Sequence, residues 1–341
     1  MFATRDDCVV SGVCLVTGGT GAVGPRLVQQ LVRDGYVARV FSRKPPPSGL
    51  LPEGVSICLG DLLDEEALRK AAAGVDYIFH LAALLHVTDP PVEMRSEYHR
   101  VNVQGTAAVV RVAREMGVRR VVFFSTIAVY GVSGGRILNE KTPPQPETFY
   151  GQTKLEAEKI IVEARRMDGL KLGCALRLAA VYGPRIKGNY RRLVQALARR
   201  RFVQIGSGGN RRTLIYEQDA VNAACLLALH PVAAGRVFNV SDGQFHTVRE
   251  IITTVCEGLG RKAPRVVMPI APVRCAASLM EVAFGVVGAN SPLRCATIDK
   301  YVEDVAVESR QIEDELGFRP RFNLRQGWRE TILAMQQNRE L

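Results

Sequence analysis

The sequence predicts an α/β protein built on a doubly wound parallel sheet, with a second, smaller and mainly helical domain. Two observations carry this prediction. Short β-forming runs alternate with helical patterns through the first half of the chain, as in successive βαβ units. The alternation loosens after Gly183 and Pro184, and a chain of 341 residues exceeds the usual size of one compact domain.

The elements of the first half can be placed in order along the chain. The β-forming runs lie at residues 13–17, 37–42, 55–59, 77–81, 121–125 and 172–178. Helical patterns fall between them, at residues 24–33, 65–73, 103–116 and 153–166. Because helices separate the strands, we expect a parallel sheet with helices on both faces.

A glycine-rich turn follows the first predicted strand. In LVTGGTGAVG, three glycines lie at GxxGxxG spacing between a buried strand and a helix that opens with Pro25. Glycine in this turn lets the backbone come close to a pyrophosphate, whose charge the helix N-terminus favours. We therefore predict a Rossmann-type dinucleotide site, and its turn is expected to use Gly18, Thr20, Gly21, Ala22, Val23 and Gly24.

The second half of the chain is expected to be interleaved with the first. A basic helix at residues 191–201 and a glycine-rich turn at 206–209 precede a helix from Asp219 and a strand at 237–240. We assign residues 1–183 with 213–245 to the dinucleotide-binding domain, and residues 184–212 with 246–341 to a substrate-binding domain. The cleft is expected at the C-terminal ends of the strands, where open α/β sheets bind ligands.

The ends of the second and third strands bear on the choice of dinucleotide. The second strand ends in Phe41-Ser42-Arg43-Lys44, without an acid to hydrogen-bond the ribose 2′-hydroxyl of NAD. Arg43, beside Ser42, favours the 2′-phosphate, so the expected cofactor is NAD(P) with a preference for NADP. Asp61, followed by Leu62, ends the third strand, where its carboxylate can accept the adenine amino group or cap the next helix.

A tyrosine and a lysine four residues apart are the candidate catalytic pair. Tyr150 and Lys154, in YGQTK, share one face of a predicted helix, although such pairs also decorate helix surfaces. A nearby ammonium and an oxidised nicotinamide favour the phenolate, so we expect the pKa of Tyr150 to be lowered. The phenolate can take a hydroxyl proton while hydride leaves the same carbon. Ser125 and Thr126 end a strand beside the expected crevice, where a hydroxyl can orient the reacting oxygen or simply satisfy a turn.

Several motifs along the chain resemble those of extended short-chain dehydrogenases of the NAD-dependent epimerase/dehydratase type. The segments TGGTGAVG, GDLLD, FHLAA, VNVQGT, STIAVYG, YGQTK and LRLAAVYGP have the family's order and spacing, and the resemblance covers essentially the whole chain. It implies that Thr126 supplies the catalytic hydroxyl, that Tyr150 is the acid and base, and that Lys154 binds the ribose. It also implies an adenine contact from Asp61 and a cofactor lining formed by His80, Leu81, Ala82 and Ala83.

The second half of the chain resembles the family's nucleotide-sugar enzymes. Arg212 lies seven residues before Asp219 in RRTLIYEQD, where the family's arginine grips the substrate diphosphate, and Arg211 is a close competitor. Ala180 replaces an asparagine that many members use for the substrate phosphate, and Asn189 is a possible substitute. VYGPRIKGNY resembles a bacterial branch that acts on UDP-N-acetyl-hexosamines in surface-polysaccharide synthesis. The resemblance therefore implies a UDP-sugar substrate, and a 4-epimerase or a 4-keto-6-deoxy-sugar reductase.

Two other functions stay open at this point. A 3β-hydroxysteroid-type or other apolar hydroxyl dehydrogenase fits the family and the apolar segment at residues 266–288, but Arg212 opposes it. A non-catalytic dinucleotide sensor is the alternative from another class, and a poised phenol argues against it. The helices at 103–116 and 153–166 can pair in a homodimer, as the resemblance implies, or pack on the sheet.

Composition and charge exclude other classes of protein. The net charge is +11, but the basic residues are spread along the chain, and their tightest cluster at 191–201 suits a solvated face or a phosphate-bearing substrate. No nucleic-acid partner is therefore expected. The eight cysteines are scattered without metal-ligand spacing, so neither disulfides nor a metal site is expected. The N-terminal MFATRDDCVVSG lacks the apolar run of a signal peptide, which favours a cytoplasmic location.

One apolar segment stands apart. Residues 266–288 are strongly apolar, but Pro269, Pro272, Arg274 and Glu281 interrupt them. A spanning helix needs about 20 apolar residues with few charges, so we expect a buried helix of the smaller domain. Peripheral membrane contact is the alternative.

Overall fold

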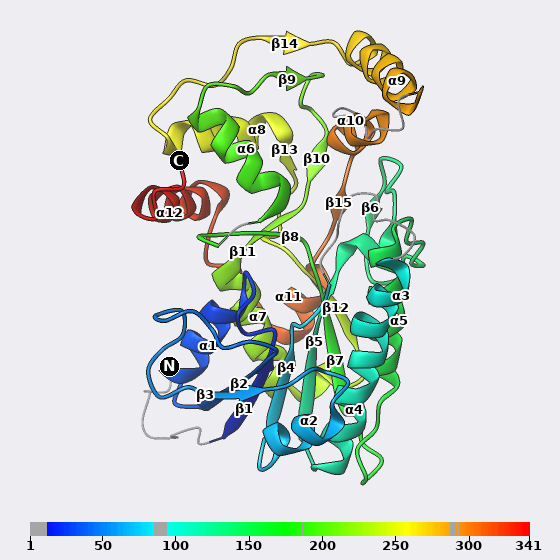
Figure 1. Ribbon diagram of the computed structural model, residues 1–341, viewed down its shortest axis with the longest axis vertical. Coiled ribbons are helices and arrows are strands. Elements are labelled where there is room, and N and C mark those ends of the chain that lie inside the picture. Colours follow the sequence, from blue (N-terminus) through cyan, green and yellow to red (C-terminus); the bar gives the residue numbers. More distant parts are fainter. Residues whose placement is uncertain (1–11, 85–93, 186, 287–290, 292–293) are drawn as a thin grey trace.

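A seven-stranded parallel sheet forms the centre of the molecule, with strand order β12-β7-β5-β4-β1-β2-β3 (Figure 1). The computed structural model describes residues 12–84, 94–185, 187–286, 291 and 294–341. The strands are β1 (Val13–Thr17), β2 (Val37–Ser42), β3 (Ser56–Leu59), β4 (Tyr77–His80), β5 (Arg120–Thr126), β7 (Gly173–Leu178) and β12 (Val237–Val240). The predicted α/β class and the doubly wound parallel sheet are confirmed.

Helices cover both faces of this sheet because successive strand residues point to opposite sides. In β1, Cys14 and Val16 join the cluster that includes α1 (Gly24–Arg33) and α7 (Glu217–Leu229). Leu15 joins the opposite cluster, which α2 (Glu65–Ala72), α4 (Gly105–Glu115) and α5 (Phe149–Glu163) cover. The apolar faces of α4 and α5 therefore pack on the sheet, and the homodimer stays a prediction.

The helix that carries the candidate catalytic pair begins earlier than predicted. The sequence pattern placed its start at Thr153, whereas α5 begins at Phe149. The Thr148 side chain caps it by accepting a hydrogen bond of 3.1 Å from the backbone N–H of Gly151. This cap brings Tyr150 into the first turn of the helix. The helix expected from residue 103 is preceded by α3 (Met94–Tyr98) and a π-helical turn, η1 (His99–Gln104).

A smaller second layer lies at the C-terminal edge of the sheet. Its core contains Trp328, which stacks on Tyr182 with ring centroids 4.7 Å apart. The elements of this layer and its connections are β6 (Ile137–Leu138), β8 (Ala180–Tyr182), α6 (Gly188–Ala198), β9 (Gln204–Ile205), β10 (Arg211–Arg212), β11 (Leu214–Tyr216), β13 (His246–Thr247), α8 (Val248–Gly258), β14 (Val267–Met268), α9 (Ile270–Val286), α10 (Cys295–Val302), β15 (Ala306–Val307), α11 (Arg310–Leu316) and α12 (Leu324–Gln337), with short 3-10 turns η2 (Ile127–Tyr130) and η3 (Pro231–Ala233). The domain boundaries drawn from the sequence stay a prediction. Within the range assigned to the substrate-binding domain, α11 contributes Ile312 and Leu316 to the core of the sheet.

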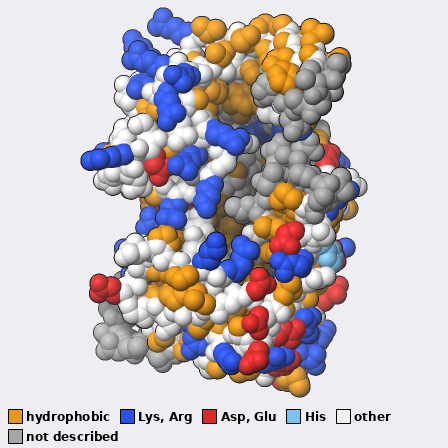
Figure 2. All heavy atoms as spheres, in the orientation of Figure 1, with side chains coloured by type: hydrophobic (Ala, Val, Ile, Leu, Met, Phe, Trp, Pro, Cys, Tyr) orange, Lys and Arg blue, Asp and Glu red, His pale blue; other side chains and the backbone are white. Residues whose placement is uncertain are grey.

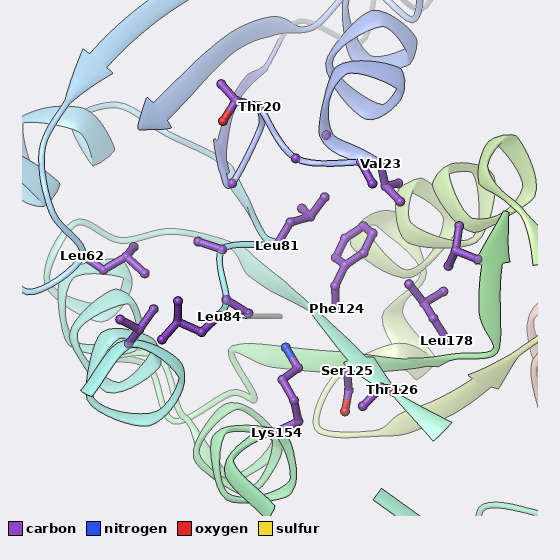
Figure 3. A pocket seen from close by; sticks show the side chains of 18 of the residues that line it. Thr20, Val23, Leu62, Leu81, Leu84, Phe124, Ser125, Thr126, Lys154 and Leu178 are labelled. Carbon is purple, nitrogen blue, oxygen red and sulfur yellow. The ribbon is translucent and has the colours of Figure 1, made fainter. Parts of the chain in front are cut away.

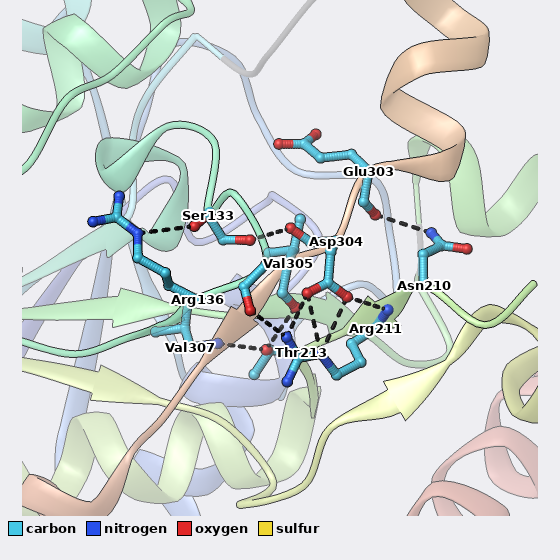
Figure 4. A network of polar contacts seen from close by, with 10 residues as sticks. Ser133, Arg136, Asn210, Arg211, Thr213, Glu303, Asp304, Val305 and Val307 are labelled. Atoms are coloured by element: carbon cyan, nitrogen blue, oxygen red, sulfur yellow. Dashed lines mark hydrogen bonds and ion pairs between the residues drawn. The ribbon is translucent and has the colours of Figure 1, made fainter.

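A polar network ties the chain after α10 to β10 and to the loop after β5 (Figure 4). The Arg211 guanidinium donates to both carboxylate oxygens of Asp304, from Nε to Oδ1 at 3.2 Å and from Nη2 to Oδ2 at 2.6 Å. The Ser133 hydroxyl donates to the backbone carbonyl of Asp304, and the Thr213 hydroxyl donates to that of Val305. Arg211 is thus engaged in a structural ion pair, which weakens it as a competitor of Arg212 for a substrate.

The expectation of a buried helix within residues 266–288 is wrong for the part that the structure describes. α9 buries Val273 and Ala277 against Ile298 of α10, but Leu279 is 71% exposed and Val282 is 66% exposed. The helix contacts its neighbour along one narrow apolar stripe, and most of its other described apolar side chains stay exposed. Residues 287 and 288 lie outside the described residues. Nowhere in the described ranges is a helix both long and apolar enough to cross a bilayer.

Candidate active site

Close backbone approaches explain the glycines after β1. Gly18 has φ +72°, and a Cβ at this position would lie 2.6 Å from the backbone nitrogen of Ala82. A Cβ at Gly24 would lie 2.5 Å from the carbonyl oxygen of Gly19. Glycine at both positions lets the turn fold tightly against the end of β4 and bring the N-terminus of α1 to the cleft. No described side chain caps that helix, so its N-terminal end can receive an anion.

A cleft of about 590 Å³ opens at the C-terminal ends of β1, β4 and β5 (Figure 3). That size is typical of a small-molecule or cofactor site. It also lies where the strand order reverses between β1 and β4, the usual ligand position in doubly wound sheets. The cleft brings together, among the predicted residues, Gly18, Thr20, Gly21, Ala22, Val23, Gly24, Ser42, Arg43, Asp61, Leu62, Leu81, Ala82, Ala83, Ser125, Thr126, Tyr150 and Lys154.

The loops after β2 and β3 form one end of the cleft. Asp64, not Asp61, caps α2, because its side chain accepts the backbone N–H of Ala67 at 3.0 Å. The capping alternative for Asp61 is therefore wrong. Its Oδ1 instead accepts the N–H of Leu63 at 3.0 Å, which holds the carboxylate at the lining of the cleft. Arg43 is exposed at the same end.

The candidate pair lies on the first two turns of α5, at the floor of the cleft. The Lys154 amino group points from α5 toward the cavity, 3.9 Å from the ring centroid of Phe123 (Figure 3). Burial lowers the pKa of Lys154 to about 7, and the charge of Glu158 acts in the opposite direction. Burial also raises the pKa of Tyr150 to about 12, with a smaller contribution from Tyr98. The expected lowering of the Tyr150 pKa is therefore wrong for the protein chain by itself, because loss of solvation opposes the phenolate.

The two hydroxyls at the end of β5 have different partners. The Ser125 hydroxyl is buried and donates to Glu158 Oε2 at 2.7 Å. Thr126 is half-buried, and its oxygen accepts the N–H of Ala128 at 3.2 Å as the cap of η2. Because Thr126 acts there as an acceptor, its hydroxyl hydrogen can be donated to a ligand in the cleft.

A buried ionic network lies beneath the catalytic helix. The Arg177 guanidinium on β7 donates to both carboxylate oxygens of Glu158 on α5, with Nη2 at 2.6 Å from Oε1. Arg177 Nη1 also donates to the Tyr130 hydroxyl at 2.8 Å, and that hydroxyl donates to Asn239 Oδ1 at 2.9 Å. The network therefore joins α5 to β5, β7 and β12. Sequence reasoning missed it, although a lone arginine in the apolar run CALRL is a signal of a buried partner.

His80 supports the cleft from behind and is not part of its lining. It is fully buried at the end of β4, with Nδ1 2.6 Å from Thr17 Oγ1 and Nε2 3.0 Å from Thr106 Oγ1. The Thr106 hydroxyl donates to the carbonyl of Asn102, so it accepts from His80 Nε2–H, and Nδ1 accepts from Thr17. The expectation that His80 lines the cofactor with Leu81 to Ala83 is wrong for this residue. Burial and the nearby Lys154 charge lower its pKa to about 3.

We expect His80 to make the fold sensitive to acid. Below its ordinary pKa of 6.5 the unfolded chain binds a proton at His80, while the folded chain does so only near pH 3. Between pH 6.5 and about pH 3, this residue should lower the free energy of unfolding by up to ~1.4 kcal/mol per pH unit as the pH falls. Urea unfolding at several pH values should show a shallower pH dependence in His80→Asn. Replacement of the half-buried His99 is the control, and an unchanged slope in His80→Asn would contradict the prediction.

The two predicted substrate residues lie apart from the lining of the cleft. Arg212 donates from Nη2 to the backbone carbonyls of Lys300 and Tyr301, at 2.5 and 3.1 Å. Asn189 is exposed in the first turn of α6. Lys187, just before that helix, does line the cleft, together with Ala180 and Val181. Sequence reasoning did not select Lys187, although it belongs to the same VYGPRIKGNY segment.

The fold and the cleft define a Rossmann-type nicotinamide dinucleotide-binding protein. A glycine turn, an uncapped helix N-terminus and the helix that carries Tyr150 and Lys154 all meet in one cavity. Comparison with known proteins then makes the assignment specific. The chain belongs to the NAD dependent epimerase/dehydratase family, whose model matches residues 14–241.

The relatives include a sugar epimerase and a hydroxysteroid dehydrogenase. The chain is 27% identical to an N-acetyl-α-D-glucosaminyl-diphospho-ditrans,octacis-undecaprenol 4-epimerase of Escherichia coli O157:H7, over 93% of each chain. It is 31% identical to a 3-β-hydroxysteroid dehydrogenase of Mycolicibacterium neoaurum, over 75% of this chain and 72% of the relative. Among solved structures, MoeE5 in complex with UDP-glucuronic acid and NAD is 29% identical, with a TM-score of 0.75 over 96% of this chain and all of that one (100%).

Proposed function

We propose that this protein transfers hydride at C4 of a nucleotide sugar, with UDP as the nucleotide, as a 4-epimerase or a 4-keto-6-deoxy-sugar reductase. The observation that carries the proposal is the position of Tyr150, Lys154 and Thr126 in the same cleft as the dinucleotide turn. A protein that only binds a dinucleotide has no use for a phenol, an amine and a hydroxyl gathered at one point. The proposal is therefore catalytic and not that of a sensor.

Each of these residues has a defined role in the proposed reaction. When bound in the cleft, a nicotinamide dinucleotide would supply the hydride acceptor and donor for C4. Tyr150 takes the proton of the C4 hydroxyl during oxidation and donates it to the C4 carbonyl oxygen during reduction. Thr126 donates a hydrogen bond to the same oxygen and holds it in place. Lys154 holds the ribose and adds positive charge that favours the phenolate.

The phosphate-binding capacity of the second layer supports a nucleotide sugar. Lys187 lines the cleft, whereas Arg212 lies on β10 in the same layer but outside the cleft lining. Nucleotide sugars such as UDP-sugars carry a diphosphate, for which lysine and arginine are the usual partners. Solved relatives hold UDP-sugars, and the Escherichia coli relative is named for a sugar on a diphospho-lipid. A free or a lipid-carried diphosphate sugar therefore suits the site.

The test is turnover of a defined panel by the purified protein. UDP-glucose, UDP-N-acetylglucosamine, a 4-keto-6-deoxy nucleotide sugar and the diphospho-undecaprenol sugar are each offered with NAD(H) and NADP(H). Inversion at C4 without net change in the dinucleotide identifies an epimerase, and consumption of NADPH identifies a reductase. If none turns over and a 3β-hydroxysteroid does, the steroid alternative, which the Mycolicibacterium relative favours, replaces this proposal.

We expect Arg43 to favour NADP. It is exposed at the adenosine end of the cleft, and the loop after β2 offers no acid in FSRK. Arg43→Ala should weaken NADPH binding about 10- to 100-fold and leave NADH binding unchanged, because a charge-assisted hydrogen bond contributes ~1.5–3 kcal/mol. Fluorescence titration of both reduced dinucleotides measures this. Lys44→Ala is the matched control, and tight stoichiometric NAD in the purified wild-type protein would contradict the expectation.

A further inference from the structure

The far end of the second layer carries an uncovered apolar surface. We name the apolar rim as the outward side of α9, the β14 segment and the residue before β9, and its exposed members are Val203, Val266, Val267, Met268, Leu279 and Val282. Figure 2 shows hydrophobic side chains gathered along this upper end of the molecule, with Lys and Arg beside them. Single exposed apolar side chains are ordinary, but a contiguous group of them indicates an interaction surface.

The orientation of α9 separates its charges from its outward side. Val273 and Ala277, four residues apart, are buried on α10. Arg274 forms an ion pair with Asp299 of α10, and Glu281 accepts the backbone N–H of Cys295 at 3.3 Å. Leu279 and Val282 lie three residues apart on the side away from these contacts. The helix therefore turns both of its charged residues toward α10 and leaves an uncharged apolar side outward.

Basic residues flank the apolar rim without acidic ones among them. The basic flank consists of exposed Arg199, Arg200, Arg201, Arg261, Lys262 and Arg265. Arg261 Nη1 donates to the carbonyls at the end of α6, at 3.1 Å from that of Leu197. This contact brings together the two parts of the basic flank, residues 199–201 and residues 261–265. The sequence has no Asp or Glu from residue 258 to 280, or from 191 to 216. This end of the molecule is thus both apolar and strongly positive.

We propose that the apolar rim and the basic flank dock this protein on the surface of an anionic lipid bilayer. Leu279 and Val282 enter the boundary between headgroups and acyl chains, and the basic flank contacts lipid phosphates. Charge decides between this occupant and a second copy of the chain. A symmetric contact between two rims would bring two basic flanks together, whereas anionic headgroups neutralise them.

Vesicle co-sedimentation of the full-length protein tests the proposal. Vesicles of phosphatidylcholine and phosphatidylglycerol in equal parts should bind the protein, and phosphatidylcholine alone should bind it far less. Leu279→Ser/Val282→Ser should reduce binding about tenfold or more, because two exposed apolar side chains lose their burial. Lys262→Glu/Arg265→Glu should reduce it similarly, and added salt should weaken the wild type.

The matched control places the same change on the opposite end of the molecule. Met167 and Leu170, 74% and 61% exposed, lie between α5 and β7, and Met167→Ser/Leu170→Ser should bind vesicles as the wild type does. Equal binding by the rim variant and the wild type would overturn the proposal. So would a wild type that ignores anionic vesicles but forms a dimer that Leu279→Ser/Val282→Ser disrupts, since a second copy would then cover the rim.

Discussion

Tyr150→Phe is expected to lower kcat by about 10²- to 10⁴-fold while the protein keeps its dinucleotide, because the change removes only the phenolic oxygen. The phenyl ring retains the packing of the first turn of α5. Proton transfer to and from the reacting oxygen loses its partner, and neither Lys154 nor Thr126 replaces it at the same position. Steady-state rates with the accepted sugar, together with dinucleotide titration, measure both effects. A variant with nearly full activity would remove Tyr150 from the mechanism.

The direction of reaction should determine how the wild-type rate depends on pH. Burial raises the pKa of Tyr150 to about 12, so the neutral phenol dominates near neutrality in the protein chain itself. That form is ready to donate a proton, which suits reduction of a carbonyl. Oxidation requires the phenolate, so its rate should rise with pH and level off above the pKa of Tyr150 in the complex. The positive charge of a bound oxidised nicotinamide would lower that pKa and move the rise to lower pH. Phe123→Leu, which removes the aromatic contact of Lys154, is expected to alter this profile without removing the phenol.

The parts of the fold that depend on local sequence could be predicted. The strands β1, β2 and β12 have the predicted bounds, because each is a short β-forming run that ends at, or is directly followed by, a polar residue. The glycine turn was found because strand, turn and helix are contiguous in the sequence. For the same reason the candidate pair on α5 could be recognised, since a spacing of four residues places side chains on one helix face.

Features that depend on distant parts of the chain could not be predicted. Both Ser125 and Thr126 line the cleft, but which hydroxyl can donate to a ligand is decided by Glu158, which is 33 residues away from Ser125 in sequence and accepts its hydroxyl hydrogen. The sequence shows the charge of Lys154 that would lower the pKa of Tyr150, but not the loss of solvation in the folded site that raises it. The apolar stretch that forms α9 reads as a buried helix in sequence. Its exposure follows from the small surface that α10 offers to it.

The largest expected effect on stability comes from the ion pair beneath α5. Glu158→Gln should lower the free energy of unfolding by about 3–5 kcal/mol, because Arg177 stays buried without a counter-charge. Ser125→Ala is the matched control, since it removes a single hydrogen bond to the same carboxylate and should cost about 1–2 kcal/mol. Urea unfolding followed by circular dichroism measures all of these variants on one scale.

A double variant separates the cost of an unpaired charge from the worth of the pair. Glu158→Leu/Arg177→Met removes both charges and should recover much of the stability that Glu158→Gln loses, because well-packed apolar groups often replace a buried ion pair at little cost. The same double variant should still be a poor enzyme, since Tyr130 and Asn239 lose their link to α5 and the helix no longer holds Tyr150 and Lys154 in register. Recovery of stability with full activity would show that the ion pair positions nothing. Failure to recover stability would show that the carboxylate acts through Ser125 and β5 and not through the charge of Arg177.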